Sequence, residues 1–262
     1  MLAHLYYGYR IVATGSSFAL FGIGGLVTGL TLFPLLNCLP GDRLTKERRA
    51  QRLVHLMFRG FVGFLQLLWV AKVEVHQQQQ LARATGTLII ANHPSLLDVV
   101  ILIASVPHTN CIVKESLFHN PFTRFVLKGA GYIANNDPEQ VISACEQRLR
   151  CGDNLIIFPE GTRTTPGRPL KLQRGTARIM LRSKPPVIPV IIDCTPTTLT
   201  KGTPWYQVAP RRFTLTLSVA APWRYPIAQH LPESRQVRQL TRAIATKFNQ
   251  ELSINESIRT TN

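Results

Sequence analysis

The sequence has few acidic residues and no recognisable cysteine pairing. Its 262 residues include 14 Asp and Glu against 30 Lys and Arg, which gives a formal net charge of +16. The five cysteines are odd in number and no two of them have C-x-x-C spacing, so neither a disulfide framework nor a zinc site is expected. A cationic surplus on this scale requires an anionic partner, for which nucleic acid, an anionic lipid surface and an acidic protein or phosphate substrate all qualify.

Charge is absent altogether from residues 11–41. A secretory signal peptide would have a shorter apolar core of about 7–15 residues, whereas a helix over 11–36 would be about 39 Å long and would exceed the ~30 Å hydrocarbon core. We expect a membrane segment that either tilts across the bilayer or bends at Pro34 or its glycines and re-enters. Arg10 is the only strong cation before it and five follow at 43–52, so the rest of the chain is expected on the cytoplasmic face of the cell membrane.

A second apolar stretch, 60–71, would reach only about 18 Å as a helix and is too short to span a bilayer. It is either a core helix or a helix that lies in one leaflet beside the first. We predict that residues 1–72 form a hydrophobic helical hairpin on the membrane and that residues 73–262 form one α/β domain.

Short β-rich runs alternate with stretches long enough for helices after residue 72, which predicts an α/β sheet with both faces covered. Strands are expected at 87–92, 110–115, 131–135, 154–160, 187–193 and 213–219. Helices are expected at 95–106, 117–129, 138–151 and 173–183. In the last helix, the helical spacing predicts that four side chains pack on the body, namely Val237, Leu240, Ile244 and Phe248.

The stretch N-H-P-S-L-L-D at 92–98 directly follows one of these apolar strands. Proline is favoured at the first helical position, so Pro94 predicts a helix start, with His93 on the turn and Asp98 about one turn inside the helix. From the turn, the His93 ring can donate one nitrogen proton to the Asp98 carboxylate and present its other nitrogen as a base. Such a pair is able to deprotonate an alcohol, and an ordinary capped helix with a surface histidine is the alternative.

A second polar cluster follows the strand at 154–160. Glu160, Gly161, Thr162 and Arg163 lie at its end. Glycine lets the backbone approach a ligand closely, and neighbouring Glu and Arg side chains suit a hydroxyl and an anionic oxygen. A charged turn with a surface ion pair is the alternative. Open α/β sheets bind ligands at strand ends, so the two clusters are expected to share one site.

Together these stretches resemble the family of 1-acylglycerol-3-phosphate acyltransferases and related glycerolipid acyltransferases. The similarity covers about 85–195 in the right order and spacing. It is carried by N-H-x-x-x-x-D at Asn92, His93 and Asp98, F-P-E-G-T-R at 158–163, an R-G pair at Arg174 and Gly175, and an apolar strand with a proline at 187–192. The resemblance implies a mixed, largely parallel sheet flanked by helices.

The resemblance also implies a reaction, an O-acyl transfer in phospholipid biosynthesis. His93 would deprotonate the hydroxyl of a membrane lipid, most closely 1-acylglycerol-3-phosphate, while Asp98 orients and charge-stabilises the imidazole. The alkoxide would attack an acyl thioester carried by acyl carrier protein or coenzyme A, without an acyl-enzyme, a metal or a bound cofactor. Substrate-binding roles are implied for Asn92, Glu160, Gly161, Thr162, Arg163, Arg174 and Gly175.

The sequence departs from the family in the second motif, where Asp137 ends the run G-Y-I-A-N-N-D at the place of an expected arginine. If that arginine normally holds the acceptor phosphate, two alternatives stay open. Either the acceptor is another lyso-lipid or a specialised hydroxylated lipid, or a different cation takes over. The cations available are Arg163, Lys171, Arg174 and Lys128.

Arg174, Arg178 and Arg182 recur every four residues and form a basic stripe on one helix face. The stripe is either a solvated surface or a platform for anionic headgroups and for acidic acyl carrier protein. A nucleic-acid binder would interleave basic residues with exposed aromatics or carry a recognition helix; we recognise no such module, so nucleic acid is not an expected partner. A non-catalytic basic membrane scaffold is the remaining alternative, and the sequence does not indicate the oligomeric state.

Overall fold

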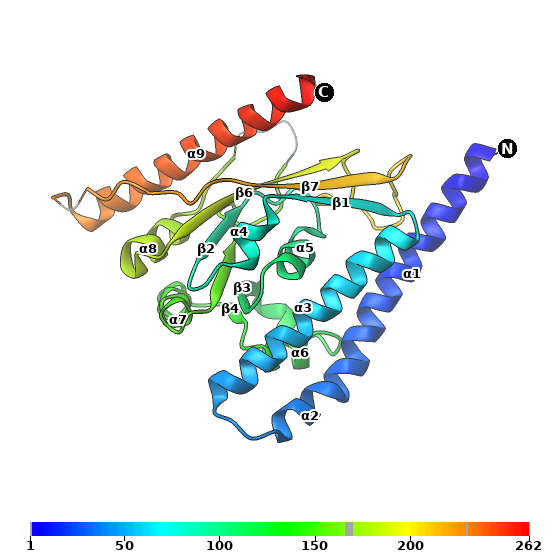
Figure 1. Ribbon diagram of the computed structural model, residues 1–262, viewed down its shortest axis with the longest axis horizontal. Coiled ribbons are helices and arrows are strands. Elements are labelled where there is room, and N and C mark those ends of the chain that lie inside the picture. Colours follow the sequence, from blue (N-terminus) through cyan, green and yellow to red (C-terminus); the bar gives the residue numbers. More distant parts are fainter. Residues whose placement is uncertain (1, 166–169, 229, 262) are drawn as a thin grey trace.

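The computed structural model describes residues 2–165, 170–228 and 230–261. Helices and strands alternate along most of the chain after a helical N-terminal part (Figure 1). In chain order the elements are α1 (Leu2–Leu30), α2 (Leu32–Cys38), α3 (Arg43–Leu67), β1 (Ala71–His76), α4 (Gln78–Ala82), β2 (Leu88–Ala91), α5 (Asp98–Ser105), β3 (Thr109–Lys114), the 3₁₀ helix η1 (Glu115–Phe118), α6 (Arg124–Gly129), β4 (Ile133–Asn135), α7 (Pro138–Arg150), β5 (Asn154–Ile157), α8 (Arg174–Ser183), β6 (Val187–Thr195), β7 (Phe213–Val219) and α9 (Glu233–Thr261).

The strands form one seven-stranded sheet in the order β1-β7-β6-β2-β5-β3-β4. Among the described strands, only the β6–β7 pair is antiparallel, so the predicted mixed, largely parallel sheet is confirmed. Strand β1 was not predicted from the sequence, because Lys72 and Glu74 interrupt its apolar pattern. It is an edge strand with partly exposed side chains, and such strands tolerate charge.

Side chains from both faces of the sheet are buried. Ile89 and Ala91 of β2 pack with α3 and α5 on one face, whereas Leu88 and Ile90 pack with α7, α8 and α9 on the other. This alternation follows from the period of two along a strand. The four α9 side chains predicted to pack on the body, Val237, Leu240, Ile244 and Phe248, are each exposed by 3% or less.

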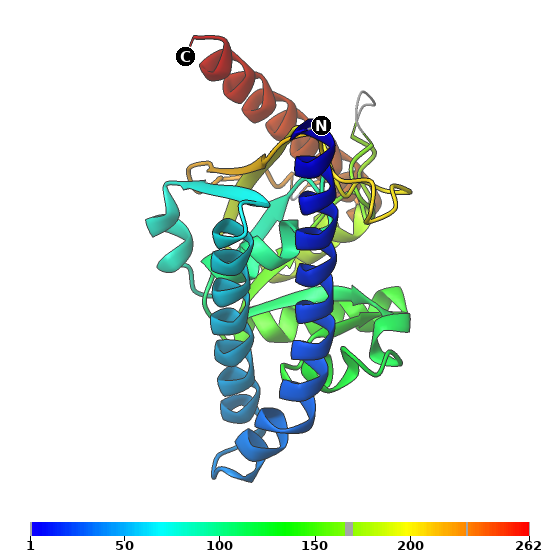
Figure 2. The same cartoon turned by 90° about the vertical axis from the view of Figure 1, so that its right-hand side faces the viewer.

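Helices α1 and α3 lie side by side and are joined through α2, which gives the hairpin predicted from the sequence (Figure 2). Phe21 of α1 contacts Phe58 and Phe61 of α3, with ring centroids 5.7 and 5.3 Å apart. The break between α1 and α2 falls after Leu30, because Pro34 has no N–H to donate to the carbonyl four residues earlier.

The second arm of the hairpin was predicted too short. The sequence indicated 60–71, whereas α3 extends from Arg43 to Leu67. Asp42 caps its start by accepting a hydrogen bond from the Thr45 N–H at 2.9 Å. The early polar residues of α3 obscured the helix in the sequence because several of them face the domain instead of solvent.

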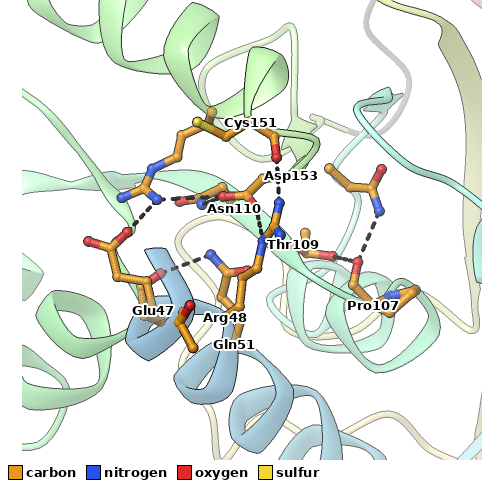
Figure 3. A network of polar contacts seen from close by, with 12 residues as sticks. Glu47, Arg48, Gln51, Pro107, Thr109, Asn110, Cys151 and Asp153 are labelled. Carbon is orange, nitrogen blue, oxygen red and sulfur yellow. Dashed lines mark hydrogen bonds and ion pairs between the residues drawn. The ribbon is translucent and has the colours of Figure 1, made fainter. Parts of the chain in front are cut away.

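Helix α3 is fastened to the α/β domain by a network of polar contacts (Figure 3). Glu47 forms an ion pair with Arg148 of α7. Arg48 pairs with the fully buried Asp153 at 3.3 Å, and Gln51 donates to a backbone carbonyl at 3.1 Å. The hairpin is therefore held against the domain by buried polar contacts as well as by apolar packing.

The outer surface of the hairpin is apolar. The stretch His4–Cys38 is long and apolar enough to cross a membrane, and little of it is buried in the structure. Large apolar side chains on α1 are more than half exposed, namely Leu5, Val12, Ile23, Val27 and Leu30. A contiguous apolar surface of this kind is typical of contact with lipid.

Candidate active site

The carboxyl end of β2 carries a histidine and aspartate pair. His93 Nδ1 lies 2.8 Å from Asp98 Oδ2, and the Asp98 side chain is fully buried while that of His93 is 17% exposed. Because a carboxylate accepts, the contact orients the ring so that Nδ1 is the donor to Asp98, and in the neutral imidazole Nε2 is then the acceptor. Nε2 has no hydrogen-bond partner within the described part of the chain, so it is available to accept a proton.

The helix after this turn begins later than predicted. It starts at Asp98 and not at Pro94. The Ser95 N–H donates to Asp98 Oδ2 at 2.7 Å, so the carboxylate closes a turn in front of the helix. Asp98 thus lies in the first turn of α5, where the helix dipole favours a negative charge.

The environment of Asp98 acts on its pKa in two directions. Burial is the largest influence and raises the pKa of this carboxyl above its ordinary value. The hydrogen bond from His93, that from the Ser95 N–H and the charge of Arg163 lower it, but less. The His93 ring, the Ser95 N–H and the Arg163 guanidinium are therefore the groups that favour the ionised form of the buried Asp98 carboxylate.

The segment after β5 wraps around His93. The Phe158 ring stacks on the imidazole with centroids 4.1 Å apart and planes at 19°. The His93 N–H is shared between Thr164 Oγ1 at 2.9 Å and Glu160 Oε1 at 3.3 Å, and the Thr164 N–H donates to the His93 carbonyl at 2.7 Å. The two predicted clusters therefore share one site, in which sequence reasoning missed Thr164, a residue with no signal beyond its place after the motif.

The turn that positions Glu160 depends on glycine. Gly161 has a φ of +65°, a left-handed conformation that glycine adopts without strain. Glu160 is buried and its carboxylate faces His93 and Thr164, so it forms no surface ion pair of the kind considered from the sequence. Thr162 is exposed on the outside of the same turn.

Arg163 holds a neighbouring loop against the site. Its Nη1 donates to the carbonyls of Leu199 at 2.8 Å and Thr200 at 2.9 Å. The Leu199 carbonyl also accepts from the Leu96 N–H at 3.2 Å. One guanidinium nitrogen is thus used to fix the loop that lies beside His93.

Asn92 fastens β2 to β6. Its Nδ2 donates to the Ile192 carbonyl at 2.8 Å, and its Oδ1 accepts from the Ile192 N–H at 2.7 Å. Both ends of the amide are used within the sheet. Asn92 therefore supports the site by holding the strand end that carries His93.

The start of α8 lies next to the turn of the second cluster, because the Gln173 N–H donates to the Pro159 carbonyl at 2.7 Å. Arg174 and Gly175, the first residues of α8, are exposed there. Further along the predicted stripe, Arg178 and Arg182 pair with Glu139 of α7 at 3.2 and 2.9 Å. The charges of Arg178 and Arg182, which lie away from the site, are thus partly neutralised by Glu139. Arg174, the first cation of the stripe, is exposed to solvent beside the turn that carries Glu160.

The acid in the second motif has a local structural role. Asp137 caps α7 by accepting from the Gln140 N–H at 2.8 Å, and Pro138 follows at the first helical position. Lys128, one of the cations considered as a substitute, lines a pocket of about 500 Å³ between α1, α2, α3 and α6. That pocket is separate from the cavity beside the His93 turn.

An apolar cavity of about 540 Å³ adjoins the turn of His93. It lies between the hairpin and the sheet, next to α5. Among the side chains that line it are Leu96, Leu97, Val100, Phe58, Phe122 and Leu199. The site thus combines an accessible base with an apolar space of the size that takes a small-molecule or lipid ligand.

Comparison with known proteins shows what the chain is similar to. Residues 72–193 match the family model described as Acyltransferase. A 1-acyl-sn-glycerol-3-phosphate acyltransferase of Cocos nucifera is 28% identical over 143 residues, which are 52% of this chain and 46% of the relative. One of Helicobacter pylori is 34% identical over 112 residues, 40% of this chain and 47% of the relative. The chain thus spans about half the length of the curated relatives it matches.

A solved structure shares the fold over almost the whole chain. The crystal structure of the 1-acyl-sn-glycerophosphate acyltransferase PlsC from Thermotoga maritima superposes with a TM-score of 0.71 at 18% identity. The superposition covers 93% of this chain and 97% of that one, so it includes the N-terminal helices as well as the sheet.

Proposed function

We propose that the chain is a member of the acyltransferase family, whose model matches residues 72–193, and that it is an O-acyltransferase of phospholipid biosynthesis. It transfers a fatty acyl group from a thioester of acyl carrier protein or coenzyme A to the hydroxyl of a lyso-glycerophospholipid, most closely 1-acylglycerol-3-phosphate. The observation that carries the proposal is the 2.8 Å contact between His93 Nδ1 and Asp98, beside an apolar cavity.

In the proposed reaction, His93 Nε2 takes the proton of the acceptor hydroxyl while the hydroxyl oxygen forms a bond to the carbonyl carbon of the thioester. The tetrahedral intermediate then collapses, the carbon–sulfur bond breaks, and the imidazolium returns the proton to the departing thiolate. Asp98 stabilises the imidazolium during the interval. The stacked Phe158 ring restricts rotation of the imidazole and so keeps Nε2 in the geometry that the reaction requires.

The two substrates are assigned by chemistry. We place the acyl chain in the cavity beside Leu96, because its lining is almost wholly apolar. The anionic headgroup of the acceptor is placed near Arg174 and those donors of Arg163 that do not bond the loop. Asp137 supplies no cation for this purpose, so an acceptor other than lysophosphatidate, either another lyso-lipid or a specialised hydroxylated lipid, stays as the second proposal.

An acceptor panel separates these proposals. Purified protein in detergent is given one acyl thioester and a set of lyso-lipids with and without a phosphate monoester, and the acylated products are quantified by mass spectrometry. Transfer to lysophosphatidate above the others supports the first proposal. Transfer only to a different lipid removes it, and transfer to none of the acceptors contradicts acyl transfer as the function.

The apolar hairpin is consistent with membrane association, and we propose that the domain faces the cytoplasm because the cations cluster after α2. Cys38 and Cys151 are exposed, whereas the other cysteines are buried, so an impermeant maleimide can report sidedness at Cys151. Labelling in inverted membrane vesicles but not in intact cells is expected. Labelling of Cys151 in intact cells would contradict the orientation.

A further inference from the structure

A buried arginine faces the apolar cavity. Arg10 of α1 is only 1% exposed and is the sole charged side chain among the described residues that line the cavity. It lies within the apolar stretch that is long enough to cross a membrane. Ionisable residues at such positions usually face the protein interior and mark a substrate path.

The guanidinium of Arg10 is only partly satisfied by the protein. Its Nε donates to the Ala209 carbonyl at 2.9 Å, and its Cζ lies 5.8 Å from the Tyr6 ring centroid. Its Nη1 is buried and has no hydrogen-bond partner in the described part of the chain. A buried charge with an unpaired donor is strongly unfavourable, so this nitrogen is suited to donate a hydrogen bond to a bound ligand.

Arg212 shows how an arginine ties two segments of this chain together: its Nε donates to the Ala71 carbonyl at 3.0 Å and its guanidinium stacks on Trp69 at 3.9 Å. Arg212 does not line the cavity. Arg10 differs from it in placing an unused donor within an apolar space.

We propose that Arg10 binds an oxygen atom of the lipid that occupies the cavity and is a specificity-determining residue. Arg10 bonds the Ala209 carbonyl, four residues before β7 begins at Phe213, whereas His93 follows the end of β2. Strand β6 stands between β2 and β7, so the lateral offset is about 10 Å, or two strand spacings. The bound oxygen is therefore well removed from the carbonyl that reacts at His93.

The shared chemistry is a hydrogen-bond-accepting oxygen, best a charged one, which a guanidinium fork binds well. Under the proposed function, on which this inference rests, it comes from an acyl chain that carries an oxygen function far from the thioester. The phosphate of the acceptor is on the carbon next to the reacting hydroxyl, too close to it to reach Arg10, and serves as the contrasting ligand of the test. Tyr132 supports an oxygenated ligand, since its Oη is also buried and unpartnered and the residue lines the same cavity.

The test measures binding without turnover. His93→Ala protein in detergent micelles is titrated with dodecanoyl and ω-hydroxydodecanoyl coenzyme A, and separately with lysophosphatidate and 1-acylglycerol. The same titrations are repeated after adding Arg10→Met, Arg10→Lys or the control Arg212→Met. A charged hydrogen bond predicts a preference of about ten- to hundred-fold for the ω-hydroxy member of the coenzyme A pair.

Arg10→Met is expected to abolish that preference, Arg10→Lys to retain part of it, and Arg212→Met to retain all of it. Loss of the preference within the coenzyme A pair supports the proposal. The proposal is overturned if that preference is absent or survives Arg10→Met, or if Arg10→Met weakens only the binding of lysophosphatidate. It is also overturned if Arg10→Met and Arg10→Lys both unfold the protein while Arg212→Met does not, because Arg10 would then be structural.

These outcomes are independent of the proposed reaction. Binding is read on protein that lacks His93, so a wild-type protein without acyl transfer would refute the proposed function and leave the binding result to stand. Conversely, an active wild-type protein whose binding preferences ignore Arg10 would refute this inference alone.

Discussion

Replacing Asp98 by asparagine isolates the charge of the carboxylate from its shape. The asparagine has the same size and retains an oxygen that can accept from His93 and from the Ser95 N–H, which now bond Oδ2 at 2.8 and 2.7 Å. The turn is therefore expected to persist. What disappears is the negative charge that stabilises the imidazolium in the transition state.

The size of the effect follows from the separation. Two unit charges about 4 Å apart interact by about 4 kcal/mol at an effective dielectric constant of about 20. Solvent reaches the His93 side chain, which is 17% exposed, so part of this energy is screened. We expect Asp98→Asn to lower kcat by about 10²–10³-fold and to leave KM nearly unchanged, because Asp98 is fully buried and does not reach the substrate.

The assay is steady-state transfer from an acyl thioester to the best acceptor of the panel, measured over a range of both substrates. Asp42→Asn is the matched control, since Asp42 caps α3 and asparagine caps helices equally well. A kcat for Asp98→Asn close to that of the wild type would refute the proposed role of the carboxylate. An increase in KM alone would also refute it.

Three further substitutions test the strand contact of Asn92, the attachment of the hairpin and the basic stripe of α8. Asn92→Ala leaves two buried backbone groups of β6 unpaired at about 1–3 kcal/mol each, so calorimetry should show a Tm lower by at least about 4 °C; an unchanged Tm contradicts the strand-fastening role. Burial alone would raise the pKa of Glu47, but the hydrogen bond from Arg148 and other contacts lower it below its ordinary value of 4.5. The ionised Glu47 carboxylate therefore stabilises the folded protein fully above about pH 4.5. This contribution to the free energy of unfolding is lost as the pH falls through the lowered pKa. Glu47→Gln should therefore reduce the unfolding free energy at neutral pH by about 2 kcal/mol and flatten its acid dependence, and an unchanged acid limb contradicts this. Glu139→Gln frees two cations of α8 and should strengthen flotation with anionic vesicles about fivefold with little change in Tm, whereas equal flotation argues against a lipid-facing stripe.

The parts of the site that the sequence predicted correctly are local ones. His93 and Asp98 are five positions apart, so a turn after a strand is enough to bring them together. The positions of most strands along the chain likewise follow from short apolar runs. The placement of Glu160 beside His93 followed from a general property of sheets, because neighbouring parallel strands present their carboxyl ends at one edge.

The parts that it did not predict depend on contacts across the chain. Asn92 is 100 positions from its partner Ile192, and nothing in the motif distinguishes a strand-fastening amide from a substrate-binding one. The same holds for Arg163, whose loop partners follow it by 36 and 37 positions. Arg10 is 199 positions from Ala209, and the sequence identifies it only as the cation that precedes the uncharged segment 11–41.

The late start of α5 has a different cause. Pro94 satisfies the rule for a first helical residue, but the buried Asp98 carboxylate accepts the Ser95 N–H and so ends the turn at a later position. Local preference was overridden by the demand that a buried carboxylate be hydrogen-bonded. In this protein that demand coincides with the placement of the proposed base.

The most direct measurement is single-turnover acyl transfer by His93→Ala protein, with wild-type protein and Asp42→Asn protein analysed in parallel. Loss of a positioned base predicts a rate lower by about 10²–10⁴-fold. Because the His93 side chain is held mainly by Asp98 and Phe158, the Tm is expected to stay near that of the wild type. A His93→Ala protein that transfers the acyl group at close to the wild-type rate would contradict the account.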